Sequence, residues 1–238
     1  LRKAYQQDVY ESKRVLVPLC GKSVDLTFLA GRGHEVVGVE CASKALDDFD
    51  DENSDLLAED TLARSSGSHS SPFVTRKWVN KRSIEAEEGD AGSGASGSVT
   101  MLQGDIFDLS VESTGGAVDL IWDRASLVAL PPHSHSEYAS KLSSLLTAGR
   151  EGHCRILLSV VEYPQHQNKG PPFSVSSDDV HRLYPLSKGF EVSELSRENV
   201  LHNGQHERFI KRGVTKFEEV LYRVKRREPL TGTPVCHD

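Results

Sequence analysis

The chain between Arg14 and Glu40 changes its spacing of apolar positions in a way that predicts strand, turn, helix and strand. The continuous apolar run 15–17 is typical of a strand covered on both faces. Pro18 and Gly21 interrupt that run, and apolar residues then recur at helical spacing over 24–30. A second apolar run, 35–39, leads directly to Glu40. The pattern therefore predicts one unit of a parallel sheet, with a turn at one strand end and an acid at the next.

The same alternation of short apolar runs and amphipathic stretches continues along the rest of the chain. Helices are predicted over 42–57, with Ser43 as N-cap, over 134–148 and over 178–184. Further strands are predicted, the last two antiparallel at the sheet edge, over 99–103, 118–122, 155–161, 190–196 and 217–224. Together with the first two runs they predict an α/β chain with a seven-stranded, mostly parallel sheet and helices on both faces.

Residues 61–98 do not follow this alternation. Two stretches rich in Ser, Gly and acids, 65–71 and 85–98, predict flexible linkers. The segment PFVTRKWVNKRSI between them favours a short hairpin, in which Trp78 is a packing residue. We therefore expect 61–98 to be a flexible insert that is dispensable for ligand binding, and 226–238 to be a frayed tail.

Composition narrows the class of protein. A chain of 238 residues can form a single domain, and its net charge of −7 disfavours a nucleic-acid partner. No apolar run is long enough for a membrane span, and no signal-peptide pattern is present, so a cytoplasmic location is predicted. The cysteines have no paired or metal-binding spacing, which favours free thiols: Cys20, Cys41, Cys154 and Cys236.

The turn at Gly21 limits the ligand that this edge of the sheet can hold. A dinucleotide fingerprint needs three glycines and a Walker A loop needs an earlier glycine before Lys22, and neither is present. Glu40 nevertheless stands where an acid contacts ribose hydroxyls in Rossmann-like units. A nucleoside ligand without phosphates fits both observations, and S-adenosylmethionine is the common one. The alternative is a purely structural unit, because fold alone does not determine function.

Two later strand ends carry further candidate residues. Asp105 and Ile106 follow the strand at 99–103, where they can contact an adenine ring or serve as a helix-entry acid and a core residue. Arg124 ends the strand at 118–122, beside Asp123. A cation there favours the thiolate form of a bound thiol, although a structural ion pair with Glu40 or near Asp123 is the alternative.

Five blocks in this order resemble the thiopurine S-methyltransferase family, which includes plant thiol and halide methyltransferases. They span nearly the whole chain: VPLCGKS with GHEVVGVE, QGDIFDL, DLIWDRASLVALPP, GPPFSV and ERFIKRGVTKFEEVLYRV. The resemblance implies a Rossmann-like class I methyltransferase fold and S-adenosylmethionine as cofactor. It also implies methyl transfer to the sulfur of a small aromatic or heterocyclic thiol by a monomer.

The resemblance also assigns roles to individual residues. Arg124 and Arg208 are the candidate catalytic residues, and no metal site is expected. The expected substrate contacts are Pro171, Pro172 and Arg208, and the expected cofactor contacts are Leu19, Gly21, Glu40, Asp105, Ile106 and Arg124. The family carries an N-terminal lid, of which this chain is expected to retain only a last helix near residues 2–10. Two alternatives stay open: another small acceptor such as a halide, and a non-catalytic cofactor-binding domain.

Overall fold

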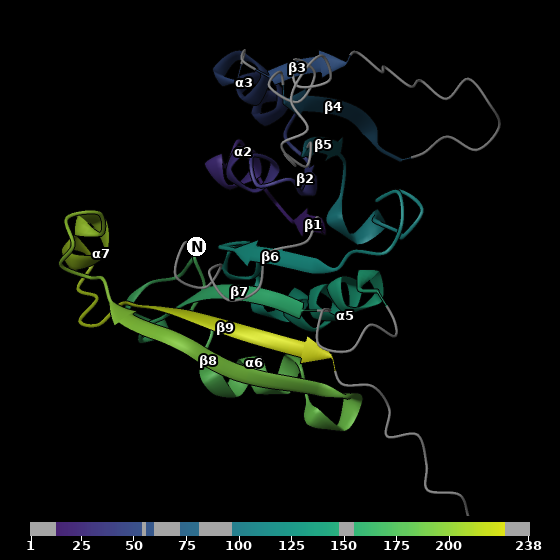
Figure 1. Ribbon diagram of the computed structural model, residues 1–238. Coiled ribbons are helices and arrows are strands. Elements are labelled where there is room, and N and C mark those ends of the chain that lie inside the picture. The colour runs from purple at the N-terminus through teal and green to yellow at the C-terminus, as the bar shows by residue number, and fades with distance from the viewer. Residues whose placement is uncertain (1–12, 54–55, 60–71, 81–96, 148–154, 227–238) are drawn as a thin grey trace, which may run out of the picture.

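The computed structural model describes residues 13–53, 56–59, 72–80, 97–147 and 155–226. Its strands form one nine-stranded sheet in the order β3-β4-β5-β2-β1-β6-β7-β9-β8. Figure 1 shows this order from β3 at the top to β8 at the bottom, with α7 beyond the edge toward which β6 points. The expected lid residues 2–10 and the tail 227–238 lie outside the described residues.

The centre of the sheet is parallel, as the sequence predicts. Its parallel strands are β1 (Arg14–Val17), β2 (Glu35–Glu40), β5 (Ser98–Gln103), β6 (Leu120–Arg124) and β7 (Arg155–Glu162). The last two strands, β8 (Phe190–Asn199) and β9 (Glu218–Arg226), are antiparallel at the edge, also as predicted. Because five parallel strands end at one edge, the side chains that follow them gather there.

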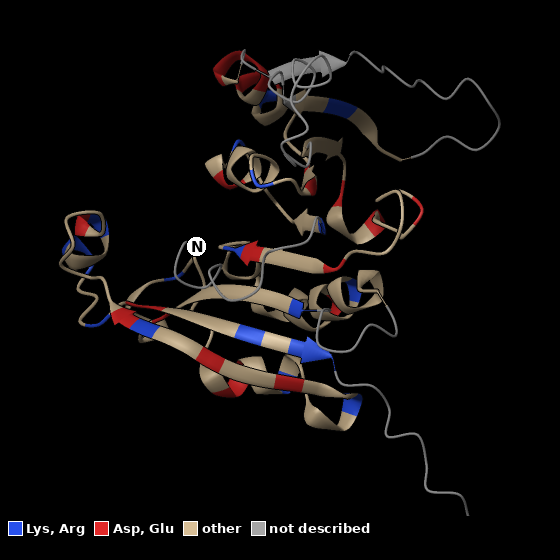
Figure 2. Ribbon diagram, in the orientation of Figure 1, with Lys and Arg blue, Asp and Glu red and all other residues tan. Residues whose placement is uncertain are grey.

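Four helices begin close to their predicted positions: α2 (Val24–Ala30), α3 (Ser43–Glu52), α5 (His135–Leu145) and α6 (Ser177–Leu183). The short α7 (Glu207–Lys211) was not predicted. The predicted cap of α3 is wrong, because Ala42 is the N-cap and Ser43 is already helical. Figure 2 shows the acidic stretch on α3, and its exposed carboxylates confirm the predicted solvated face.

The centre of the predicted insert belongs to the sheet. Val74–Asn80 form β4, which pairs antiparallel with β5 from Val74 opposite Gln103 to Val79 opposite Ser98. Leu56–Glu59 form β3, which pairs with β4 and replaces the predicted end of the helix at 42–57. The seven-strand prediction is therefore two strands short, and the segment predicted as a short hairpin supplies one strand, β4, of the main sheet. The predicted linker at 65–71 lies outside the described residues, as does the one at 85–98 up to residue 96, and Ser98 already begins β5.

Two large apolar clusters cover the two faces of the sheet. Leu26 and Leu29 of α2 and Phe49 of α3 pack on one face, whereas Tyr138 and Leu142 of α5 pack on the other. The apolar runs of the central strands are buried on both faces, which explains why they read as continuous apolar sequence. This packing fixes the strand ends from which the candidate residues project.

Trp78 ties β4 to α3, as the predicted packing role requires. Its side chain is 1% exposed, its ring lies 5.1 Å from the Phe49 ring, edge to face, and its Nε1 donates to Asp50 at 2.9 Å. We expect Trp78→Ala to lower the free energy of unfolding by about 3–5 kcal/mol, because it leaves a cavity. Urea denaturation checks this, with the exposed neighbour Lys77→Ala as control. Equal effects of the two substitutions on the free energy of unfolding would contradict the place of β4 as a packed strand of the sheet.

Candidate functional site

The turn after β1 presents backbone to the carboxyl edge of the sheet. Leu19 and Gly21 both have positive φ, 43° and 50°. Such a conformation is ordinary for glycine but uncommon for leucine. The Cys20 N–H donates to the Val39 carbonyl at 3.0 Å, so this turn is fixed against the end of β2. A Cβ added at Gly21 would meet no atom within 4 Å, which leaves open space over the turn.

Glu40 ends β2 beside this turn, as the sequence predicts. Its Oε2 accepts from the Gly21 N–H at 3.0 Å, and its Oε1 accepts from the Ala42 N–H at 2.9 Å. Two backbone donors therefore orient a half-buried carboxylate at the edge. The predicted alternative partner Arg124 is not bonded to it. Burial and this carboxylate raise the pKa of the Cys20 thiol to about 12, so that cysteine stays protonated.

Asp105 and Ile106 lie at the neighbouring strand end. The Gly104 N–H donates to the Glu40 carbonyl at 3.0 Å. Burial raises the pKa of the Cys41 thiol, followed by its hydrogen bond to Glu40 and the Glu40 charge, and the Asp105 charge adds the smallest contribution. The Asp105 carboxylate caps the short helix η2 (Ile106–Asp108) by accepting from the Phe107 N–H at 2.9 Å. Ile106 is 5% exposed in the core. Both residues thus have the structural role that the sequence left open, and their predicted cofactor contacts stay predictions.

The turn after β6 is held by a buried carboxylate. Asp123 is fully buried; its Oδ1 accepts from the Ser126 and Leu127 N–H groups at 3.2 Å, and its Oδ2 accepts from the Tyr138 hydroxyl at 2.9 Å. Burial raises the pKa of Asp123 to about 6, although these donors lower it. The Ser126 hydroxyl donates to the Pro18 carbonyl at 2.7 Å. The turn that carries Arg124 is therefore tied to the turn that carries Leu19.

Arg124 pairs with a residue that sequence reasoning missed. Its Nη1 lies 3.0 Å from Oδ2 of Asp25 on α2, and the Trp122 indole donates to the same oxygen at 2.8 Å. Arg124 therefore forms an ion pair, as the alternative expected, but the expected partners, Glu40 or a group near Asp123, are wrong. An acid in the first turn of the helix after Gly21 was the available signal. Its partner, 99 positions away, could not be read from the sequence.

The proline loop and α7 share one support, Tyr163. The Tyr163 hydroxyl donates to the Pro172 carbonyl, and its ring packs on Phe217 and Phe209 at 5.4 and 6.4 Å between centroids. Phe209 belongs to α7, directly after Arg208. Tyr163 therefore links the two segments that carry the predicted substrate residues. Tyr163 itself was missed, although its place two residues after a predicted strand was a usable signal.

The same loop also contacts the Arg124 turn. The Phe173 N–H donates to the Val128 carbonyl at 2.6 Å, within the short helix η3 (Leu127–Ala129) that follows Arg124. Asn199 at the end of β8 pairs with Glu218 at the start of β9, and Glu218 also pairs with Glu162, the last residue of β7. The connection between β8 and β9, which contains α7, therefore leaves the sheet at the carboxyl edge. The predicted site residues up to 172 therefore lie at or after the carboxyl ends of parallel strands, and α7, which carries Arg208, lies beyond the same edge (Figure 1).

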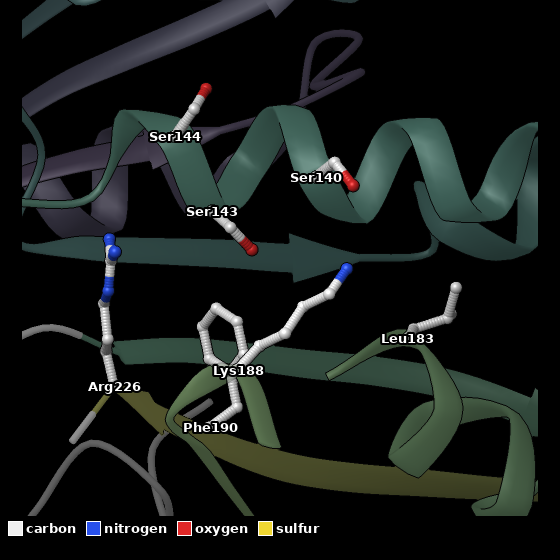
Figure 3. A pocket seen from close by; sticks show the side chains of 7 residues that line it. All are labelled: Ser140, Ser143, Ser144, Leu183, Lys188, Phe190 and Arg226. Atoms are coloured by element: carbon white, nitrogen blue, oxygen red, sulfur yellow. The ribbon is translucent and has the colours of Figure 1, made fainter. Parts of the chain in front are cut away.

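A cavity of about 310 Å³ lies elsewhere, where β8 begins and β9 ends (Figure 3). It lies between α5, α6 and the short helix η6 (Leu186–Lys188), at the opposite end of the strands. Its serines each donate to a carbonyl of their own helix. Its lining consists of Ser140, Ser143, Ser144, Leu183, Lys188, Phe190 and Arg226, none of them a predicted site residue.

Comparison with known proteins identifies the family. A sequence model of thiopurine S-methyltransferase matches residues 1–227. The thiopurine S-methyltransferase of Pseudomonas fluorescens is 39% identical over 89% of this chain and 81% of its own length. That of Shewanella woodyi is 38% identical over 92% and 85%. The chain belongs to the thiopurine S-methyltransferase family.

Solved structures confirm the predicted fold. A S-adenosylmethionine-dependent methyltransferase of Methanosarcina mazei matches with a TM-score of 0.58 and 13% identity, over 96% of this chain and 99% of that one. Magnesium protoporphyrin IX methyltransferase of Synechocystis, solved with S-adenosylmethionine, matches with a TM-score of 0.51 and 16% identity, over 90% and 70%. The fold is that of class I methyltransferases, and the cofactor is S-adenosylmethionine.

The residues at the carboxyl edge fit that cofactor. An oriented carboxylate at Glu40 can accept hydrogen bonds from ribose hydroxyls, and the open space over Gly21 admits a ligand close to the backbone. Among the described residues, no group of three or more His, Cys, Asp and Glu could hold a metal ion. None of the described helices is both long and apolar enough to cross a membrane.

Loss of the Glu40 carboxylate should weaken cofactor binding. In Glu40→Ala, the Gly21 and Ala42 N–H groups lose their acceptor and a ribose loses its charged partner. We expect binding of S-adenosylhomocysteine to weaken by about 1.5–3 kcal/mol, measured by calorimetry, with no heat from NAD for the unmodified chain. Glu35→Ala, at the other end of β2, is the control. Unchanged affinity in Glu40→Ala would exclude Glu40 from the site.

Asp123 should make stability depend on pH. Its folded pKa of about 6 lies above the ordinary value of 3.8, so the folded state binds more protons between these values. Its contribution to stability is therefore fully present below pH 3.8 and is lost as pH rises through 6. Relative to Asp123→Asn, we expect the free energy of unfolding to fall by on the order of 3 kcal/mol across this range. Urea denaturation at a series of pH values measures the difference; parallel curves would contradict it.

Proposed function

We propose that this chain transfers the methyl group of S-adenosylmethionine to the sulfur of small aromatic or heterocyclic thiols. The observation that carries the proposal is the joint support by Tyr163 of the proline loop and of Phe209, the residue of α7 that follows Arg208. This arrangement offers a cation and a firm apolar wall at the edge where the cofactor residues lie. A flat ring carrying a thiol has the shape and chemistry for such a place.

Arg208 supplies the charge for the acceptor in this proposal. It is exposed, its guanidinium lies 4.8 Å from the Phe209 ring centroid, and no carboxylate among the described residues pairs with it. An uncompensated cation favours the thiolate over the thiol, and the thiolate is the nucleophile. When bound, the cofactor supplies an electrophilic methyl group on a positively charged sulfur.

Pro171 and Pro172 form the wall in this proposal. Fixed φ angles restrict the backbone of both residues, and three contacts hold the loop. They are the Tyr163 hydroxyl on the Pro172 carbonyl, the Phe173 N–H on Val128, and Arg212 of the α7 cap on Asn168 at 2.8 Å. A wall held in this way can orient an aromatic acceptor without closing around it. Orientation is the main requirement, because methyl transfer needs the three reacting atoms in line.

A methylation assay with the unmodified chain tests the proposal. We expect turnover with 6-mercaptopurine and thiophenol that exceeds turnover with iodide or hydrogen sulfide at equal concentration, measured as S-adenosylhomocysteine released. The reverse preference would favour the halide and small-thiol alternative. Cofactor binding without turnover on any of these acceptors would favour the non-catalytic alternative.

Substitution of Arg208 should affect acceptors according to their pKa. Arg208→Ala removes the charge that favours the thiolate, so turnover should fall most for thiols of high pKa and least for those already ionised at the assay pH. Arg208→Lys keeps the charge and should retain part of the activity, although it loses the planar fork. Both variants should bind S-adenosylhomocysteine normally.

Lys211→Ala, another exposed cation of α7, is the matched control. Initial rates over a series of substituted thiophenols measure the effect. Equal losses for all thiols would leave Arg208 as a steric wall and exclude the thiolate role.

A further inference from the structure

The two candidate arginines differ in their charge environment. Arg124 is paired with Asp25 at 3.0 Å, whereas no carboxylate among the described residues pairs with Arg208. The Arg124–Asp25 pair has no net charge. Of the two candidate arginines, Arg124 is therefore compensated by a carboxylate and Arg208 is not.

Asp25 is the fixed partner of this pair. Its side chain is only 10% exposed, compared with 56% for Arg124, and it lies in the first turn of α2. The buried Trp122 indole donates to the same carboxylate oxygen at 2.8 Å, which fixes the carboxylate independently of Arg124. Trp122 and Arg124 are two positions apart on β6, so both reach α2 from the same face of the strand.

Arg124 keeps donors available beyond this pair. Only its Nη1 is hydrogen-bonded among the described residues, so the rest of the fork is oriented but unoccupied. A ligand at the edge therefore meets a positioned donor without meeting a net positive charge. This matters because the cofactor itself carries a positive sulfonium, which a free arginine nearby would repel.

We propose that Asp25 is a positioning and specificity-determining residue that orients Arg124 and cancels its charge, so that a cationic methyl donor and an acceptor with no negative group besides its thiolate are accepted beside it. Only the part of this inference that concerns the acceptor rests on the proposed function. Arg208 then remains the one arginine of the two that attracts negative charge. Replacement of Asp25 by a neutral residue turns Arg124 into a free cation.

Relative binding of two nearly identical ligands tests the cofactor part. S-adenosylmethionine and S-adenosylhomocysteine differ by the methyl group and one positive charge, so the ratio of their dissociation constants reports charge near the sulfur. We expect Asp25→Asn to weaken the binding of S-adenosylmethionine by about three- to tenfold relative to the binding of S-adenosylhomocysteine, because one partly screened charge is added near the sulfur. Calorimetry on the full chain measures both constants without any turnover.

A double-mutant cycle separates charge from shape. Arg124→Gln should shift the ratio in the opposite direction, and the double variant Asp25→Asn/Arg124→Gln should return close to the unmodified chain. Glu35→Gln removes an acid from another arginine pair, with Arg14, at the far end of β2, and is the matched control. An unchanged ratio in Asp25→Asn, or shifts in the same direction in both single variants, would overturn the proposal.

Acceptor preference gives a second, separable measurement. In Asp25→Asn, methyl transfer to 4-mercaptobenzoate should rise relative to thiophenol, because the added carboxylate finds a free cation. An unchanged preference together with a shifted binding ratio would overturn the acceptor part alone. If the unmodified chain binds both cofactor forms but methylates no thiol, the proposed function fails while the binding ratio still decides the role of Asp25.

Discussion

Hydrogen bonds between successive strand-end turns hold the carboxyl edge together. Backbone groups that leave a sheet need partners, and here each turn finds them in the next. The Cys20 N–H bonds to Val39, the Gly104 N–H to Glu40, and the Phe173 N–H to Val128. The Ser126 hydroxyl closes the gap between the turns after β6 and β1. The candidate residues are thus positioned by backbone contacts that do not depend on a ligand.

Patterns within one segment predicted most of the fold and the strand-end residues. The run 14–40 predicted β1, α2 and β2 because burial on both faces and helical spacing leave clear local signatures. Glu40 and Arg124 were predicted because strand ends meet at one edge. Strand β4 was predicted only as part of a short hairpin and not as a strand of the main sheet, because Ser- and Gly-rich flanks dominate the composition around it, although its pairing with β5 is regular. The partner of Arg124 was missed because an ion pair across 99 positions has no local pattern.

The ion pairs of this protein differ in what surrounds them. Pairs on α3, such as Lys44–Asp48 at 2.7 Å, involve exposed side chains and contribute little to stability. Asp25 is different, since a buried carboxylate with two donors costs free energy to desolvate and must keep both partners. Asp123 shows the same constraint with three donors and no cation. Buried acids therefore shape the two turns next to the candidate acceptor position.

The two sets of candidate contacts come from separate segments of the chain, which has an evolutionary consequence. The candidate contacts with the methyl donor come from residues 19–124. The candidate contacts with the methyl acceptor, apart from Arg124, come from residues 171–208 and are supported by Tyr163 and Phe217. The later segment can diverge while the earlier one stays constant, because the Phe173–Val128 contact that joins the proline loop to the Arg124 turn is a hydrogen bond between backbone groups. New acceptor preferences within such a lineage can therefore arise by exchange of one contiguous stretch of sequence, without rebuilding the half that holds the methyl donor.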